Sequence, residues 1–238
     1  MALYQDVVEK YLNKGMSGPN ARIMGLLNTK YILATVKNEP IVQPNPFALG
    51  NAWFVKTIET VADADAELEG LGSLNPKDTL VVQTKNAAQL DGWKYQGDST
   101  DQIKLTSYYP DKMVYEYSAK AESVAAFSEI FYPHEKGWNC YLNDQLMPNQ
   151  IFKADYLIRA LKVPAGQKQV LEMRFEPKSV KIGGTISMVT SAMALLFFLV
   201  GLFFHFKNEG FGEANQLSEV EVSKKEKPIV VQEKKKKK

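Results

Sequence analysis

The architecture of this chain is decided by the stretch Ile182-Gly-Gly-Thr-Ile-Ser-Met-Val-Thr-Ser-Ala-Met-Ala-Leu-Leu-Phe-Phe-Leu-Val-Gly-Leu-Phe-Phe-His-Phe206. Between Lys181 and Lys207 no residue carries a fixed charge, and only His205 can titrate. At ~1.5 Å rise per residue, a helix of this length measures about 37 Å, which is enough to cross a ~30 Å hydrocarbon core with some tilt. A helix also satisfies its own backbone polar groups, as lipid requires. The sequence therefore predicts a transmembrane helix over 182–206, the alternative being a buried helix of a soluble protein.

The flanks of this span differ in composition. Residues 207–238 are rich in Lys and Glu, lack a period and end in five lysines, which predicts a disordered Lys-rich tail. Such a short basic tail favours the cytoplasmic side. The whole chain holds 29 basic and 27 acidic residues, and this near-neutral balance argues against nucleic-acid binding, which needs a basic face. The partner that the sequence predicts directly is the lipid bilayer.

The N-terminus raises a question about how the folded part reaches its compartment. Residues 1–10 lack the basic start and apolar core of a signal peptide. Two alternatives follow. Either residues 1–181 are cytoplasmic and the span is a tail anchor, or the chain is the end of a larger membrane protein whose earlier spans deliver the domain. The single cysteine, Cys140, excludes an intramolecular disulfide and leaves the redox compartment open.

Residues 1–101 have the pattern of a mixed α/β segment. Helical spacing, caps and glycine stops predict short helices near residues 4–12, 21–27 and 63–71. In the third helix, the carboxylates of Asp63/Asp65 and Glu67/Glu69 are interpreted as surface charges. Aromatic and β-branched content predicts strands over 30–36, 52–60 and 79–84. Three prolines at 40, 44 and 46 predict a loop, with a turn at Asn45-Pro46.

From Gln102 the apolar pattern changes to a period of two. Residues 102–109 and 112–118 alternate around Pro110-Asp111, which predicts an antiparallel hairpin. The run 124–132 is apolar on both faces and is predicted as a central strand. Further strands are expected on both sides of an Asn143-Asp144 turn. The fold class predicted is therefore mainly β, with an antiparallel sandwich or jelly-roll module over 102–177, short N-terminal helices and one C-terminal transmembrane helix.

One group of side chains has the chemistry of a sugar contact. Trp138 and Tyr141 offer aromatic faces for apolar C–H surface, while Asn143 and Asp144 offer groups for hydroxyls. The alternative, which we weight more heavily, is that the two aromatic residues pack in the core or on the sheet. Trp53 and Trp93 carry the same two interpretations.

Motifs for catalysis and metal binding are scarce. The chain has no phosphate-binding loop, no nucleophile elbow and no His-Glu-x-x-His motif. The spacing of His134 and Cys140 matches no familiar ligand set. We therefore predict no catalytic residue, no cofactor and no metal in this chain. In the span, Gly183, Ser187 and Ser191 recur at every fourth position, which suits close packing against another helix, although a lone anchor accommodates the same residues.

Several sequence pieces, in this order, resemble the C-terminal region of YfhO-like bacterial membrane proteins of the Bacteroidetes type: Asn28-Thr-Lys-Tyr-Ile-Leu33, Asn45-Pro-Phe-Ala-Leu-Gly-Asn-Ala-Trp-Phe-Val55, Phe131-Tyr-Pro133 with Gly137-Trp138, Arg159-Ala-Leu-Lys-Val-Pro-Ala-Gly166 and Arg174-Phe-Glu-Pro177. The resemblance implies a long protein with many spans, similar to glycosyltransferases that use lipid-linked sugars. It also implies that residues 1–181 are extracytoplasmic, and that the catalytic acids lie upstream of this chain. The chain departs from the family pattern by inserting residues between Pro133 and Trp138.

Two functions follow as expectations. The first is a β-domain and last span that support lipid-linked glycosyl transfer in the bacterial inner membrane, with upstream helices and a glycan or lipid-linked sugar as partners. The second is a non-catalytic, membrane-anchored module that binds carbohydrate or serves as an envelope scaffold.

Overall fold

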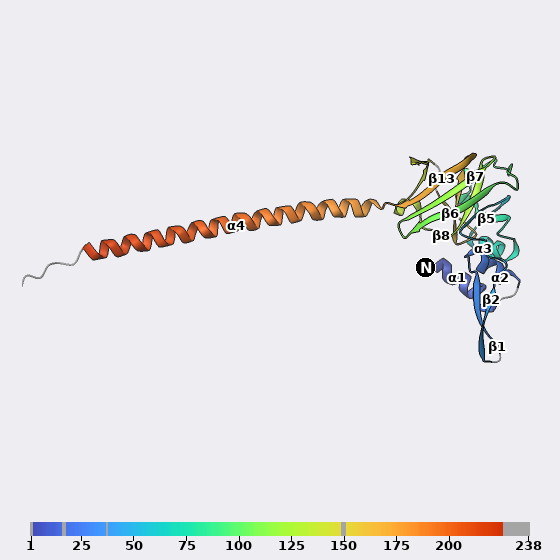
Figure 1. Ribbon diagram of the computed structural model, residues 1–238, viewed down its shortest axis with the longest axis horizontal. Coiled ribbons are helices and arrows are strands. Elements are labelled where there is room, and N and C mark those ends of the chain that lie inside the picture. Colours follow the sequence, from blue (N-terminus) through green and yellow to red (C-terminus); the bar gives the residue numbers. More distant parts are fainter. Residues whose placement is uncertain (1, 16–17, 37, 149–150, 226–238) are drawn as a thin grey trace, which may run out of the picture. The chain divides into compact units, whose positions relative to one another are not determined.

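The computed structural model of the chain describes residues 2–15, 18–36, 38–148 and 151–225. It divides into two units, Met1–Lys178 and Ser179–Lys238. As the sequence predicts, the structure is mainly antiparallel β sheet with short N-terminal helices and one long apolar C-terminal helix (Figure 1).

Two antiparallel sheets form a β-sandwich in the first unit. One sheet has the strand order β10-β9-β13-β7-β6, built from Gln145–Leu146, Trp138–Leu142, Gly166–Phe175, Lys112–Ala119 and Gln102–Tyr109. The other has the order β11-β12-β8-β3, built from Phe152–Ala154, Ile158–Val163, Ser123–Ile130 and Ala52–Phe54. Between them lies a core that includes Tyr115, Phe127 and Leu171, each fully buried. The predicted β6–β7 hairpin is confirmed, and Ile103 pairs with Tyr117.

The four-stranded sheet is covered on both faces. Ala125 and Phe127 of β8 face the sandwich core, while Val124 and Ala126 face a second core. That second core is made with α1 (Ala2–Lys10), α2 (Pro19–Leu26), α3 (Ala64–Ser73) and the parallel pair of β4 (Thr57–Val61) and β5 (Thr79–Gln83). A strand buried on both faces has no reason to alternate, which explains the continuous apolar run in β8.

The predicted division between residues 1–101 and 102–177 does not separate two units. β3 belongs to the first segment but pairs with β8, placing Trp53 opposite Ala126. Met1–Lys178 therefore folds as one compact unit. Short 3₁₀ helices complete it: η1 (Leu12–Lys14), η2 (Thr84–Asn86), η3 (Ala88–Leu90) and η4 (His134–Lys136).

Two strand predictions differ from the structure. The single strand expected over 52–60 is two strands, because the chain leaves the four-stranded sheet after β3 and pairs with β5 as β4. The expected Pro-rich loop contains β2 (Glu39–Pro44), which forms a hairpin with β1 (Tyr31–Val36). Prolines are tolerated there because each strand of an isolated hairpin has one edge without a ladder.

The second unit is the helix α4 (Lys178–Lys225). Its segment Lys178–Lys207 has a mean hydropathy of 2.3 over its most apolar window and is long enough to cross a membrane. The hydroxyls of Thr185 and Thr190 donate to carbonyls one turn back, so they need no outside partner. The helix continues into the segment predicted as a disordered tail, where Glu and Lys are good helix formers; residues 226–238 lie outside the described part.

Candidate functional site

The loop after β2 is built around the buried side chain of Asn45. Its Nδ2 donates to the carbonyls of Ala21 (3.2 Å) and Thr29 (3.0 Å), and its Oδ1 accepts the Phe47 backbone N–H (3.1 Å). This arrangement confirms the turn predicted at Asn45-Pro46. It also ties the loop to the first turn of α2 and to the segment after that helix, so the residues that follow have a fixed position.

A glycine on α2 lets this loop approach closely. A Cβ added at Gly25 would lie 2.0 Å from the Phe47 carbonyl oxygen, which no side chain tolerates. The Leu49 N–H also donates to the Gly25 carbonyl (3.1 Å). The loop therefore rests directly on the α2 backbone, with Phe47 exposed and Leu49 packed against the core beneath it.

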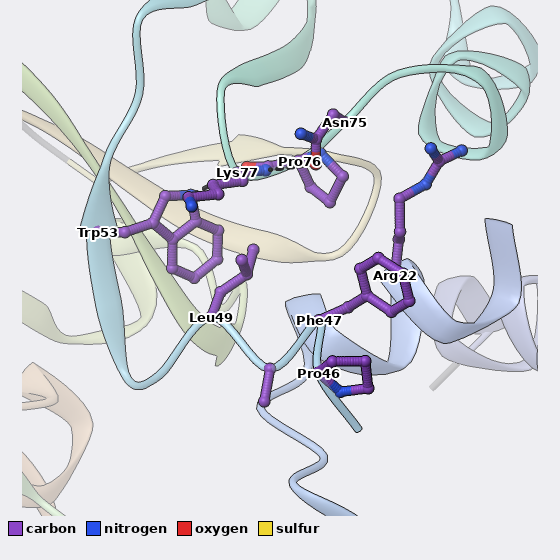
Figure 2. A pocket seen from close by; sticks show the side chains of 9 residues that line it. Arg22, Pro46, Phe47, Leu49, Trp53, Asn75, Pro76 and Lys77 are labelled. Atoms are coloured by element: carbon purple, nitrogen blue, oxygen red, sulfur yellow. Dashed lines mark hydrogen bonds between the residues drawn. The ribbon is translucent and has the colours of Figure 1, made fainter. Parts of the chain in front are cut away.

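The loop forms one side of a pocket of about 450 Å³, which we call the Trp53 pocket (Figure 2). It is lined by Arg22, Pro46, Phe47, Ala48, Leu49, Trp53, Asn75, Pro76 and Lys77. Trp53 and Phe47 stand on opposite sides of the hollow in Figure 2. The Trp53 Nε1–H donates to the Pro76 carbonyl (2.9 Å), which fixes the indole. Trp53 is 9% exposed and forms a wall, whereas Phe47 is 46% exposed and offers an accessible aromatic face.

The charged groups of the Trp53 pocket are both positive. Arg22 and Lys77 contribute side chains, and no lining residue is acidic. The neighbouring Asp78 carboxylate is already engaged, since it accepts from Asn75 (3.0 Å) and pairs with Lys56 (3.0 Å). The lining thus combines apolar rings, an amide and two cations. It offers a place to bind a polar ring, and it holds no nucleophile paired with a base.

The four predicted sugar-contact residues do not form a shared site. Trp138 points into the sandwich core, is 7% exposed and packs on Phe175, with ring centroids 5.3 Å apart. The Arg159 guanidinium covers it at 4.2 Å. Trp138 is therefore a core residue, which is the alternative that we weighted more heavily. The period-two alternation of β9 places Tyr141 on the opposite face.

Tyr141 and Asp144 meet on the outer face of the five-stranded sheet through Arg174. Its guanidinium lies 4.2 Å from the Tyr141 ring centroid and donates to Asp144 Oδ1 (2.8 Å). The Tyr141 hydroxyl donates to Glu176 (2.7 Å), and this hydrogen bond raises the tyrosine pKa. Asn143 bonds to Gln169 and to the Val170 N–H. These polar groups are occupied within the sheet.

A buried charged cluster was missed by sequence reasoning. Glu67, interpreted as a surface charge, is fully buried and forms an ion pair with Lys153. Its other oxygen accepts the Tyr156 N–H (3.0 Å). Burial raises the pKa of the adjacent Asp155 to about 8. A signal existed: Ala64, Glu67, Leu68 and Leu71 follow the i, i+3, i+4, i+7 spacing of one helix face, so position 67 belongs to the apolar stripe.

The other residues that the sequence analysis singled out, Cys140, His134 and the small residues of the span, are not grouped into one site within the described residues. Burial raises the pKa of the Cys140 thiol to about 12, and His134 Nδ1 is bonded to the Trp138 carbonyl. Gly183, Ser187 and Ser191 lie on α4, in exposed positions. Among the described residues no group of three or more His, Cys, Asp or Glu is placed to hold a metal ion. Comparison with protein-family models, curated proteins and solved structures found no match to this chain.

Proposed function

We propose that this chain is the extracytoplasmic β-domain and last membrane span of a YfhO-like bacterial membrane protein. Its domain holds a glycan, or the sugar of a lipid-linked donor, in the Trp53 pocket. The glycosyl-transfer site itself is made elsewhere in the parent protein. The span at 182–206 anchors the domain to the inner membrane, packs against upstream helices and leaves the Lys-rich tail in the cytoplasm.

The observation that carries this proposal is that most of the Trp53 pocket is built by one of the sequence pieces that resemble the family. Five of its nine lining residues come from the run 45–55, which is one of the pieces that resemble the family. The run supplies an accessible aromatic face at Phe47 and a fixed wall at Trp53, beside the amide of Asn75. Aromatic faces with a few polar groups are a suitable surface for a sugar ring.

A second candidate is a non-catalytic, membrane-anchored module that binds carbohydrate or serves as an envelope scaffold. It is favoured by the self-contained cores of Met1–Lys178 and by the one candidate span among the described residues. The reading frame upstream of Met1 separates the two. Repeated hydrophobic spans upstream would support the YfhO-like parent, whereas a promoter and a genuine start at Met1 would exclude it.

Glycan binding is tested by titrating neutral and acidic oligosaccharides against Met1–Lys178 while following tryptophan fluorescence. Phe47→Ala removes the accessible ring, and we expect it to weaken binding about tenfold, the equivalent of ~1.4 kcal/mol. The control is Tyr109→Ala, which removes an exposed aromatic residue outside the Trp53 pocket. Equal affinities for the two variants would exclude the Trp53 pocket as the binding site.

The extracytoplasmic placement is tested by protease treatment of intact spheroplasts. We expect the β-domain to be digested from outside while the tail epitope survives. Digestion of the domain only after lysis would instead support the tail-anchored, cytoplasmic alternative.

A further inference from the structure

The two cations of the Trp53 pocket lack acidic partners. No salt bridge joins Arg22 or Lys77 to a carboxylate within the described residues, and the nearest acidic neighbour along the chain, Asp78, is paired with Lys56. By contrast, the buried Lys153 pairs with Glu67, and the partly buried Arg174 pairs with Glu172 and Asp144. The Trp53 pocket therefore carries an uncompensated positive charge.

Arg22 also has a buried donor without a partner. Its Nε is buried and has no hydrogen-bond partner, although most buried donors in folded proteins are paired. The side chain rises from α2 on the side of the pocket opposite Trp53 (Figure 2). An anion bound at this rim would give the guanidinium a charge-assisted partner that the protein does not supply.

We infer that the Trp53 pocket selects an acidic sugar, a pyranose bearing a carboxylate or a phosphate ester, with Arg22 and Lys77 binding the anion. The sugar ring lies against Phe47, and the Asn75 amide bonds to a hydroxyl. This inference rests on the proposed glycan-binding function and adds the chemical class of the ligand to it.

The dimensions and the lining agree with one small acidic ligand. A volume of about 450 Å³ lies within the range of 300–1,000 Å³ typical of small-molecule sites. The aromatic and cationic groups line one hollow, so a single ligand has to satisfy both. Two sources share this chemistry: uronic acids of an acidic polysaccharide and the phosphate-bearing sugar of a lipid-linked donor.

The inference is tested with the full chain in detergent by calorimetric titration. The probes are glucose, glucuronate, glucose 1-phosphate and inorganic phosphate. We expect at least one acidic sugar to bind about tenfold more tightly than glucose, with the advantage falling as salt rises. Arg22→Gln and Lys77→Gln are each expected to remove most of that advantage. Lys104→Gln, an exposed lysine outside the Trp53 pocket, is the matched control and has no effect.

Each outcome separates this inference from the proposed function. If glucose binds as tightly as both acidic sugars, the anion selectivity is wrong while glycan binding stands. If no sugar binds, both are wrong. If inorganic phosphate binds as tightly as glucose 1-phosphate, the pocket does not recognise a sugar, and the inference is overturned. A preference for glucose 1-phosphate supports the lipid-linked source, and a preference for glucuronate supports the polysaccharide.

Discussion

At the scale of single residues, Glu67 and Glu69 lie two positions apart on α3 in opposite surroundings. Glu67 is buried against Lys153, whereas the Glu69 side chain is 72% exposed beside Lys10. Removing one member of a buried ion pair leaves the other charge uncompensated. We therefore expect Glu67→Ala to lower the free energy of unfolding by about 3–5 kcal/mol. The matched Glu69→Ala should cost less than about 1 kcal/mol. Urea denaturation of Met1–Lys178 measures both, and two equally small losses would contradict the buried pair.

The raised pKa of Asp155 leads us to expect that the free energy of unfolding depends on pH. Its pKa is raised to about 8 by burial and by the charge of Glu67, although the Val81 N–H opposes the shift. Between about pH 4 and pH 8 the folded state therefore holds a proton that the unfolded chain has released. Stability from this group is complete below pH 4 and is lost as pH rises to 8, by at most about 1.4 kcal/mol per unit.

Asp155→Asn removes this titration and keeps the shape of the side chain. The backbone at Asp155 has φ +46°, which asparagine also tolerates. We expect the variant to lose less stability than the wild type between pH 5 and pH 8, as measured by thermal melting. Parallel pH profiles for the two proteins would show that Asp155 does not cause the dependence.

The same residues show where sequence reasoning reaches its limit. A helix start near Asp63 or Asp65 is expected from local chemistry, and the structure has the cap at Asp63, whose Oδ1 accepts the Ala66 N–H at 2.9 Å. The ion pair of Glu67 depends on Lys153, 86 residues away, so no local pattern names that partner. Trp138 was ambiguous for a similar reason: its exposure depends on Phe175 and Arg159.

At the scale of elements, the contact between α2 and the loop after β2 fixes the Trp53 pocket. Gly25→Ala places a Cβ against the Phe47 carbonyl, so the loop has to move. Overpacking of this kind costs about 1–3 kcal/mol, and we expect glycan affinity to fall with it. Gly184→Ala is the control, because its added Cβ meets no atom within 4 Å. A crystal structure of Gly25→Ala with an unmoved loop would refute the mechanism.

Strands that bury one face were predicted well from their alternation. Strands whose ends are set by contacts with two different sheets were not. The β6–β7 hairpin shows a simple alternation because one face is buried and the other is wet. β3 and β4 read as one strand because both are rich in β-branched and aromatic residues. The break between them is imposed by Asp78, whose carbonyl accepts the N–H groups of Lys56 and Thr57. Such a tertiary contact leaves no mark in the periodicity.

At the scale of the whole molecule, the two units differ in what they bury. Met1–Lys178 has cores on both sides of the four-stranded sheet, so its stability comes from its own packing. Nearly every residue of 179–207 is exposed, including large apolar ones such as Phe197 and Leu199. The fold class and the span were predictable because each follows from a strong local pattern. The Trp53 pocket was not, because it joins α2, the loop after β2 and the segment after α3.

The apolar surface of α4 predicts that membrane attachment and folding of the β-domain are separable. An arginine near the centre of a span costs about 2.5–3.5 kcal/mol of insertion free energy. We therefore expect the double variant Leu195→Arg/Leu199→Arg to shift the chain from the carbonate-resistant membrane fraction to the soluble or aggregated fraction. Leu195→Ile/Leu199→Ile keeps the apolar surface and should stay in the membrane.

Because neither position belongs to the cores of Met1–Lys178, the thermal midpoint of the β-domain should be the same in both variants. Retention of the double arginine variant in membranes would contradict a spanning α4, and a lowered midpoint would contradict two separately stabilised units.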